Sequence, residues 1–231
     1  MKHSTGVDRK ALMQWRKIER ERLIAARVAL APATVAAWRR SIDTLLERAF
    51  PGLAGKTLAL CWPIRNEYDA RHLAHRLRAR GTRTVLPVVV GPGKPLEFRA
   101  WHPGVRMAEG ALRIPYPVDG PALVPEVVLL PMNGWDMQGF RLGYGGGFFD
   151  RTLAALAARP VVIGVTYEMA HIDTIHPQEW DIPVDYVATE RGLYRRDPEG
   201  LVFLGMPEPG AAGALASPVC YADERHFGGD S

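Results

Sequence analysis

Residues 141–150 read RLGYGGGFFD and constrain the fold more tightly than any other stretch of this chain. Four of the five residues 143–147 are glycine, which lets a backbone adopt positive φ and bring its N–H groups close to a ligand. An apolar run at 127–130 predicts a buried strand before the loop, and helical spacing follows at 148–158. A strand, a glycine turn and a helix N-terminus together favour anion binding. Phosphate is the expected anion, with Arg141 as its clamp and Asp150 as a metal ligand.

The loop pattern alone leaves a second interpretation open, because glycine clusters also occur in tight turns that bind nothing. The GK[ST] ending of a Walker loop is missing, and the loop comes too late in the chain for a GxGxxG dinucleotide fingerprint. The flanking sequence therefore has to distinguish a phosphate site from a plain turn.

Outward from the loop, helical and strand patterns alternate. Apolar spacing predicts helices at 8–30, 34–50, 68–80 and 148–158, and strands at 56–62, 84–90, 97–101, 127–130, 161–167 and finally 186–189, with 115–126 irregular. This alternation predicts an α/β fold with a single mostly parallel sheet flanked by helices and a helical N-terminus. We expect this domain to span residues 1–204, and residues 205–231, rich in Gly, Ala and Pro, to form a flexible, disordered tail.

Composition sets wider bounds. The chain has 231 residues, is 47% hydrophobic and has a net charge of +4, with much of the basic excess in its first 50 residues. That excess suits a polyanion such as ATP, or is simply a solvated helix face. The two cysteines do not suggest a disulfide framework, and the histidines lack the pattern of a zinc site. Without a signal peptide or an apolar run long enough to cross a bilayer, the sequence predicts a cytoplasmic protein with no membrane partner.

The motif RLGYGGGFFD resembles the signature of the 5-formyltetrahydrofolate cyclo-ligase (5,10-methenyltetrahydrofolate synthetase) family, RLG-x-G-x-G followed by two aromatic residues and Asp. RNEYDARHL at 65–73 and EWDIPVDYVATE at 179–190 resemble further family segments in the same order. The resemblance implies a ligase of one-carbon folate metabolism that uses ATP and Mg²⁺. Such enzymes convert 5-formyltetrahydrofolate into 5,10-methenyltetrahydrofolate by phosphorylating the formyl oxygen, and release ADP and phosphate.

The resemblance also implies roles for individual residues. The loop and the first helix would bind ATP through Arg16, Arg20, Arg141, Leu142, Gly143, Tyr144, Gly145, Gly146, Gly147, Phe148 and Phe149. Arg141 and Tyr144 would be the catalytic residues, and Asp150 and Asp181 would bind Mg²⁺, a hard cation that prefers oxygen donors. The folate would contact Trp62, Glu67, Tyr144 and Phe148, with the Glu67 carboxylate on the aminopyrimidine edge.

Each role has a purely structural alternative. Glu67 could cap the following helix. Asp150, in the first turn of its helix, could stabilise that helix through a favourable interaction with the helix dipole, and Asp181 could be a turn residue. Trp62 could simply pack. The sequence also departs from the family pattern, because the aromatic pair Phe148–Phe149 lacks a tyrosine.

Two further departures concern charge. Some relatives carry Lys where this chain has Gly146, which leaves more of the phosphate charge to Arg141 and the first helix. On that helix, Arg16 and Arg20 stand where the family has a Lys and an Arg, and their spacing of four places them on one face.

Three classes of function remain open. The first is a working cyclo-ligase, with 5-formyltetrahydrofolate and ATP as its partners and a monomer or weak homodimer as its state. The second is a non-catalytic folate- or nucleotide-binding paralogue with a regulatory role. The third, a nucleic-acid-binding module, is disfavoured because acidic residues interrupt the basic N-terminus and no known motif is present.

Overall fold

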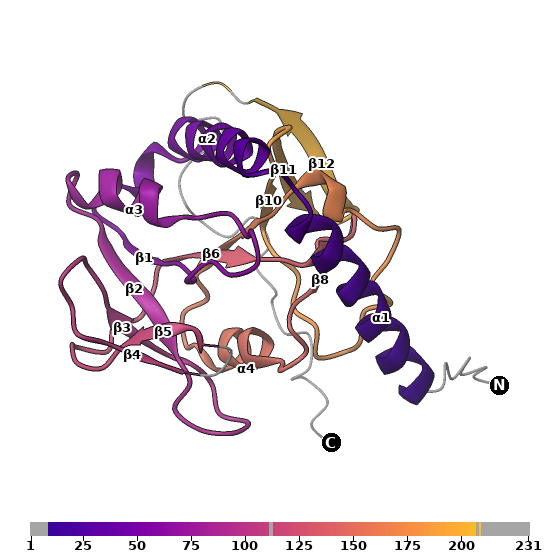
Figure 1. Cartoon of the computed structure of the whole chain (residues 1–231), viewed down its shortest axis with the longest axis horizontal. Helices are drawn as coiled ribbons and strands as arrows, with labels where there is room; N and C mark the ends of the chain where they lie inside the picture. The colour runs from indigo at the N-terminus through magenta and orange to yellow at the C-terminus, as the bar shows by residue number, and fades with distance from the viewer. Residues whose placement is uncertain (1–8, 111–112, 207, 209–231) are drawn as a thin grey trace, which may run out of the picture.

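A computed structural model describes residues 9–110, 113–206 and 208 of the chain (Figure 1). Its centre is an eight-stranded sheet with the order β12-β11-β10-β9-β6-β1-β2-β3. The strands of this sheet are β1 (Thr57–Ala59), β2 (Arg83–Val88), β3 (Glu97–Ala100), β6 (Val127–Pro131), β9 (Val161–Val165), β10 (Tyr186–Ala188), β11 (Leu193–Asp197) and β12 (Gly200–Gly205). Two short ribbons accompany it, β4 (Met107–Glu109) with β5 (Pro115–Pro117) and β7 (Gly134–Trp135) with β8 (Arg141–Leu142).

The middle of the sheet is parallel. Strands β10, β9, β6, β1 and β2 run in one direction, whereas β3, β11 and β12 pair antiparallel at the edges. Parallel strands covered on both faces require apolar side chains throughout, and every residue of β9 is buried. The expected mostly parallel α/β fold is confirmed.

Helices cover both faces of the sheet (Figure 1). Helices α2 (Pro32–Ala49) and α3 (Arg71–Arg78) pack on one face through residues such as Ile42 and Leu73, which share a core with Ile163 of β9. Helix α4 (Phe148–Ala155) covers the other face through Leu153. Helix α1 (Arg9–Val28) stands apart from these layers and packs Leu23 against Leu142 and Ile175.

The structure corrects several expected elements. Strand 186–189 is not the last one, because the hairpin β11–β12 follows it, and the stretch 115–126 begins with β5. Helix α3 begins at Arg71 instead of residue 68, since the Asp69 carboxylate accepts the backbone N–H of Arg71 at 3.0 Å. The strands β4 and β5 have only three residues each, too few for a periodic pattern, and the charged residues of β11 interrupt its apolar pattern. Most of the expected tail, 205–231, lies outside the described residues.

In the described part of the chain, none of the helices is both long enough and apolar enough to cross a membrane.

Candidate active site at the glycine loop

The glycine loop joins the ribbon β7–β8 to helix α4. Two of its residues have positive φ, Gly145 at 89° and Gly147 at 61°, a region that only glycine enters at low cost. Gly147 is the N-cap of α4, so the unpaired amides of the first helical turn follow the loop directly. The predicted arrangement of glycine turn and helix N-terminus is present, with the β7–β8 ribbon inserted between strand β6 and the loop.

Arg20 of α1 lies against this loop. Its Nε donates to the carbonyl oxygen of Gly143 at 2.5 Å, and its guanidinium would be only 3.3 Å from a Cβ at position 145. Burial, followed by the nearby charge of Arg16, lowers the pKa of Arg20. No ion pair joins Arg20 to a carboxylate among the described residues. Its positive charge is therefore available beside the loop.

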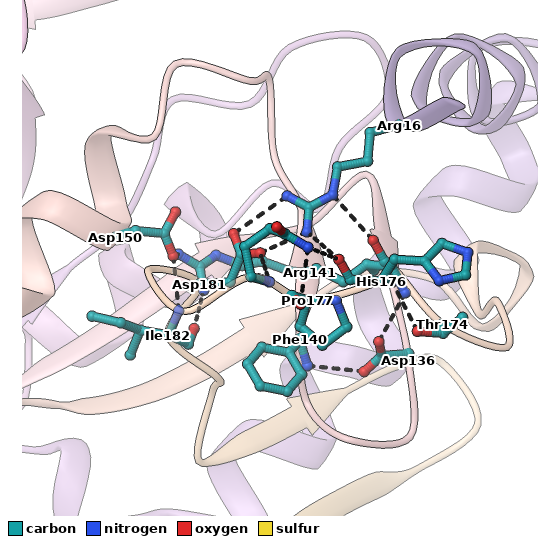
Figure 2. A network of polar contacts seen from close by, with 12 residues as sticks. Arg16, Asp136, Phe140, Arg141, Asp150, Thr174, His176, Pro177, Asp181 and Ile182 are labelled. Carbon is teal, nitrogen blue, oxygen red and sulfur yellow. Dashed lines mark hydrogen bonds and ion pairs between the residues drawn. The ribbon is translucent and has the colours of Figure 1, made fainter. Parts of the chain in front are cut away.

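Arg16 makes a different kind of contact, an ion pair with Asp181. Nη2 of Arg16 lies 2.6 Å from Oδ2 of Asp181 (Figure 2). The same guanidinium donates to the carbonyl oxygens of Ile175 at 3.1 Å and His176 at 2.8 Å. Asp181 also accepts the backbone N–H of Gln178 at 2.7 Å. These contacts fasten helix α1 to the segment before β10.

Arg141 and Asp150, at the two ends of the loop motif, form a second ion pair. Nη2 of Arg141 lies 2.8 Å from Oδ1 of Asp150 (Figure 2). Arg141 also donates to the carbonyl oxygen of Ile182 at 2.5 Å, and Asp150 accepts the N–H of Ile182 at 3.1 Å. The Arg141 side chain is 6% exposed, and burial lowers its pKa while Asp150 opposes that effect. Direct contact between Arg141 and phosphate stays a prediction, because its guanidinium here spans Asp150 and Ile182.

The two predicted metal ligands differ in how fully they are engaged. The described residues contain no group of three or more His, Cys, Asp or Glu side chains suited to a metal ion. Mg²⁺ is usually held by one or two carboxylates together with phosphate oxygens and water. Asp150 fits that donor set, since its contacts use only Oδ1. Both oxygens of Asp181 face Arg16, so metal binding there requires Arg16 to move.

Glu67 and Tyr144, which lie far apart in the sequence, meet at the other side of the loop. The Tyr144 hydroxyl donates to Oε1 of Glu67 at 2.7 Å, and Oε2 accepts the N–H of Ile64 at 3.0 Å. Arg27 of α1 completes the group, 3.5 Å from Oε1 of Glu67 and 3.3 Å from the Tyr144 hydroxyl. Burial raises the pKa of Glu67, and Arg27 is the strongest opposing influence. A buried carboxylate beside a phosphate-type loop suits the recognition of a polar heterocycle.

Trp62 borders a cavity of about 690 Å³. Asp69, Arg71 and Trp101 also line this cavity, and the Arg71 guanidinium lies 4.4 Å from the centre of the Trp62 ring. Cavities of this size accommodate drug-sized ligands. The segment 62–71 therefore contributes Trp62 and Asp69 to the cavity and Glu67 to the group around Tyr144.

The remaining predicted loop residues separate into two sets. Leu142 is buried against Leu23, and Phe149 packs into the core beneath α4, so their side chains do not line the loop. Phe148 lies under the guanidinium of Arg151, 5.2 Å from the ring centre. Arg151 also donates to the carbonyl oxygen of Gly146 at 2.6 Å. Of the aromatic pair Phe148–Phe149, it is therefore Phe148 that contacts a charged residue beside the loop, Arg151.

A family model identifies the chain. The model of the 5-formyltetrahydrofolate cyclo-ligase family matches residues 12–190. The chain belongs to this family. Its motif RLGYGGGFFD lies within the matched region, and family membership makes it an enzyme of the ligase type.

Similar proteins agree with this assignment. The 5-formyltetrahydrofolate cyclo-ligase of Mycolicibacterium smegmatis is 34% identical over 150 residues, which cover 61% of this chain and 77% of that protein. The cyclo-ligase of Escherichia coli K12 is 32% identical over 149 residues, covering 60% and 80%. The structure of 5,10-methenyltetrahydrofolate synthetase from Aquifex aeolicus aligns with a TM-score of 0.69 at 25% identity, over 82% of this chain and 97% of that one. A second such synthetase, from Mycoplasma pneumoniae, shares the fold, with a TM-score of 0.63 at 22% identity over 76% and 98% of the two chains.

The sequence analysis missed Arg27, although α1 contains a signal for it. Arg16, Leu23 and Arg27 are all buried residues of this helix, and their spacing continues one helical stripe. An arginine in the line of an apolar stripe either pairs with a buried acid or approaches a ligand.

Proposed function

We propose that this member of the cyclo-ligase family catalyses the ATP- and Mg²⁺-dependent cyclisation of 5-formyltetrahydrofolate to 5,10-methenyltetrahydrofolate. The hydrogen bond between Tyr144 and Glu67 is the observation that supports this most directly. It joins the glycine loop, suited to phosphate, to a buried carboxylate, suited to the aminopyrimidine edge of a pterin. The two substrates would thus meet at one residue of the loop.

The nucleotide side of the proposal depends on charge. The N–H groups of the loop and of the first turn of α4 would bind phosphate oxygens. Arg20, beside Gly143 and Gly145, would supply a positive charge next to the phosphates. Arg141 and Arg16 would act less directly, by holding Asp150 and Asp181 in place.

The reaction needs positioning and charge neutralisation more than an enzyme nucleophile. The formyl oxygen attacks the γ-phosphorus of ATP, the bond to the bridging oxygen breaks, and ADP leaves. The side-chain nitrogen N10 of the folate then attacks the activated formyl carbon, loses its proton, and phosphate departs with the former formyl oxygen. Glu67 would orient the pterin, and Phe148 would pack on it. Bound Mg²⁺, held by Asp150 with or without Asp181, would neutralise phosphate charge.

A coupled assay tests the proposal. The protein is mixed with 5-formyltetrahydrofolate, ATP and Mg²⁺, and the methenyl chromophore is followed together with release of ADP. We expect one ADP per methenyl product and no signal without ATP. With 5-methyltetrahydrofolate, which has no formyl oxygen to phosphorylate, neither product is expected.

Two results would refute the cyclo-ligase proposal. Folded protein that binds 5-formyltetrahydrofolate without any turnover would instead indicate the regulatory paralogue. If the folded protein binds neither folate nor ATP, both the cyclo-ligase and the regulatory paralogue are excluded.

A further inference from the structure

Tyr167 is a buried tyrosine whose hydroxyl group has no hydrogen-bond partner in the part of the chain that the structure describes. The residue is 1% exposed, and its ring packs on Trp38 with 5.0 Å between ring centres. A phenylalanine would fill the same space without leaving a polar group unpaired in the core. Buried hydroxyl groups are almost always paired, so packing alone does not explain this one.

Other buried tyrosines of the chain follow the usual rule. The Tyr68 hydroxyl donates to Asp43 at 2.6 Å, and the Tyr194 hydroxyl donates to Glu168 at 2.8 Å. The fold therefore supplies partners for tyrosine hydroxyls where their role is structural. Tyr167 differs from both.

The position of Tyr167 is one where ligands bind in open α/β sheets. It follows the carboxyl end of β9, which lies between β6 and β10 in the middle of the sheet. Its neighbour Thr166 donates to the carbonyl oxygen of Met132 at 2.9 Å, and Arg27 reaches the same oxygen at 3.5 Å. The residue before Tyr167 thus shares a carbonyl oxygen with Arg27, which belongs to the group with Glu67 and Tyr144.

Burial and the surrounding charges also set the protonation state of the Tyr167 phenol. Burial raises the pKa of Tyr167 to about 12, the positive charge of Arg27 opposes this, and the negative charges of Glu190, Glu67 and Asp69 add to it. The hydroxyl therefore stays protonated at neutral pH and can donate a hydrogen bond. Asp69 also lines the cavity that Trp62 borders.

We propose that Tyr167 is a substrate-binding residue whose hydroxyl donates a hydrogen bond to the ring carbonyl of the bound pterin, beside Glu67. This inference rests on the proposed function, since it assumes that the ligand is a pterin. A pterin carries N–H donors, which suit the Glu67 carboxylate, next to a carbonyl acceptor, which suits the Tyr167 hydroxyl. Oδ1 of Asn133, also buried and unpaired in the described chain, follows the end of the adjacent strand β6 and adds an acceptor. Tyr144, which is 36% exposed between Gly143 and Gly145, is the side chain that would move to admit the ring.

The experiment compares Tyr167→Phe with Tyr194→Phe and the wild type. It measures the Kd for 5-formyltetrahydrofolate without ATP by calorimetry, steady-state KM and kcat, and the Tm of each protein. For Tyr167→Phe we expect Kd and folate KM to rise about tenfold, the value of one hydrogen bond. We also expect an unchanged KM for ATP and a Tm no lower than wild type, since an unpaired group is removed. Tyr194→Phe should lower Tm and leave Kd unchanged.

The outcomes separate this inference from the proposed function. If the wild type binds and converts 5-formyltetrahydrofolate but Tyr167→Phe binds it equally well, the role of Tyr167 is wrong and the function stands. If Tyr167→Phe loses Tm as Tyr194→Phe does, its hydroxyl is a structural group and the inference is likewise wrong. If the wild type neither binds nor converts the folate, both the role of Tyr167 and the proposed function are wrong.

Discussion

The hydroxyl group of Tyr144 lies 2.7 Å from Oε1 of Glu67, across 77 positions of sequence. This contact brings the middle of the glycine loop to the carboxylate that the sequence assigns to folate binding. It also occupies that carboxylate, so a pterin must take the place of the Tyr144 hydroxyl to reach it. Tyr144 can move because Gly143 and Gly145 flank it.

Tyr144→Phe should shift the pH dependence of the reaction. The hydrogen bond from Tyr144 favours ionised Glu67 and so lowers a pKa that burial raises. Without the hydroxyl, the pKa of Glu67 rises further, and the acid limb of kcat/KM for the folate moves to higher pH. A pH profile from pH 4 to 9 checks this, using about six buffers of constant ionic strength. An acid limb that stays in place or moves to lower pH would show that Tyr144 does not stabilise the Glu67 anion.

Glu67→Gln should weaken folate binding. A carboxylate accepts hydrogen bonds from two pterin N–H groups, and losing its charge costs about 1.5–3 kcal/mol, or roughly 10- to 100-fold in folate KM. The KM for ATP should change much less. Glu47→Gln is the matched control, because Glu47 pairs with Arg76 away from the loop. Equal folate KM values for both variants would remove Glu67 from the substrate site.

Glu67→Gln should also change how the unfolding free energy of the protein depends on pH. Because burial raises the folded-state pKa of Glu67 above its usual 4.5, the folded state binds this proton more tightly than the unfolded state. The resulting stabilisation is complete below the unfolded pKa and is lost as pH rises through the folded pKa. The wild type should therefore lose unfolding free energy relative to Glu67→Gln as pH rises above about 4.5. Urea unfolding at several pH values measures this, and a constant difference would contradict it.

Arg20 and Arg16 should give opposite phenotypes, although they share one helix face. Arg20→Ala should raise the KM for ATP by roughly 10- to 100-fold, as expected for a charge-assisted contact, with a stability loss of about 1 kcal/mol. Arg16→Ala leaves Asp181, whose side chain is only 12% exposed, without its ion-pair partner and should cost about 3 kcal/mol of unfolding free energy. Arg22→Ala, an exposed residue of α1 paired with Glu19, serves as the control. A higher KM for ATP in Arg22→Ala would mean that general positive charge, and not Arg20, attracts the nucleotide.

Asp150→Asn should change the response to Mg²⁺. The amide keeps an oxygen for Arg141 and the N–H of Ile182 but is a poor ligand for a hard cation. We expect the Mg²⁺ concentration for half-maximal activity to rise at least about tenfold, with a stability loss of about 1–2 kcal/mol because Arg141 loses its counter-charge. Asp119→Asn, at an exposed ion pair with Arg106, should behave as wild type. An unchanged Mg²⁺ titration for Asp150→Asn would show that Asp150 does not bind the metal and only holds Arg141 in place.

Much of the fold follows from local sequence pattern. The alternating apolar periodicities predict the central strands, the helices α1 and α2 and the mostly parallel sheet, because those elements bury continuous apolar surface. The hairpin β11–β12 and the β4–β5 ribbon escaped prediction. Their strands are stabilised by the neighbour with which they pair and have little periodicity of their own.

The sequence by itself determined the chemistry of the loop, the family and the residue types available at the site. Glycines with positive φ, a helix beginning at Phe148 and an acid in its first turn are local properties, so a linear pattern is sufficient to predict them. Tertiary structure alone decided which charges pair. Arg16 meets Asp181 across 165 positions, Arg141 turns to Asp150 and Ile182, and Arg20 keeps its charge beside the loop. Ion pairing depends on which segments meet when the sheet and α1 pack together, and that information is not contained in any single stretch of the chain.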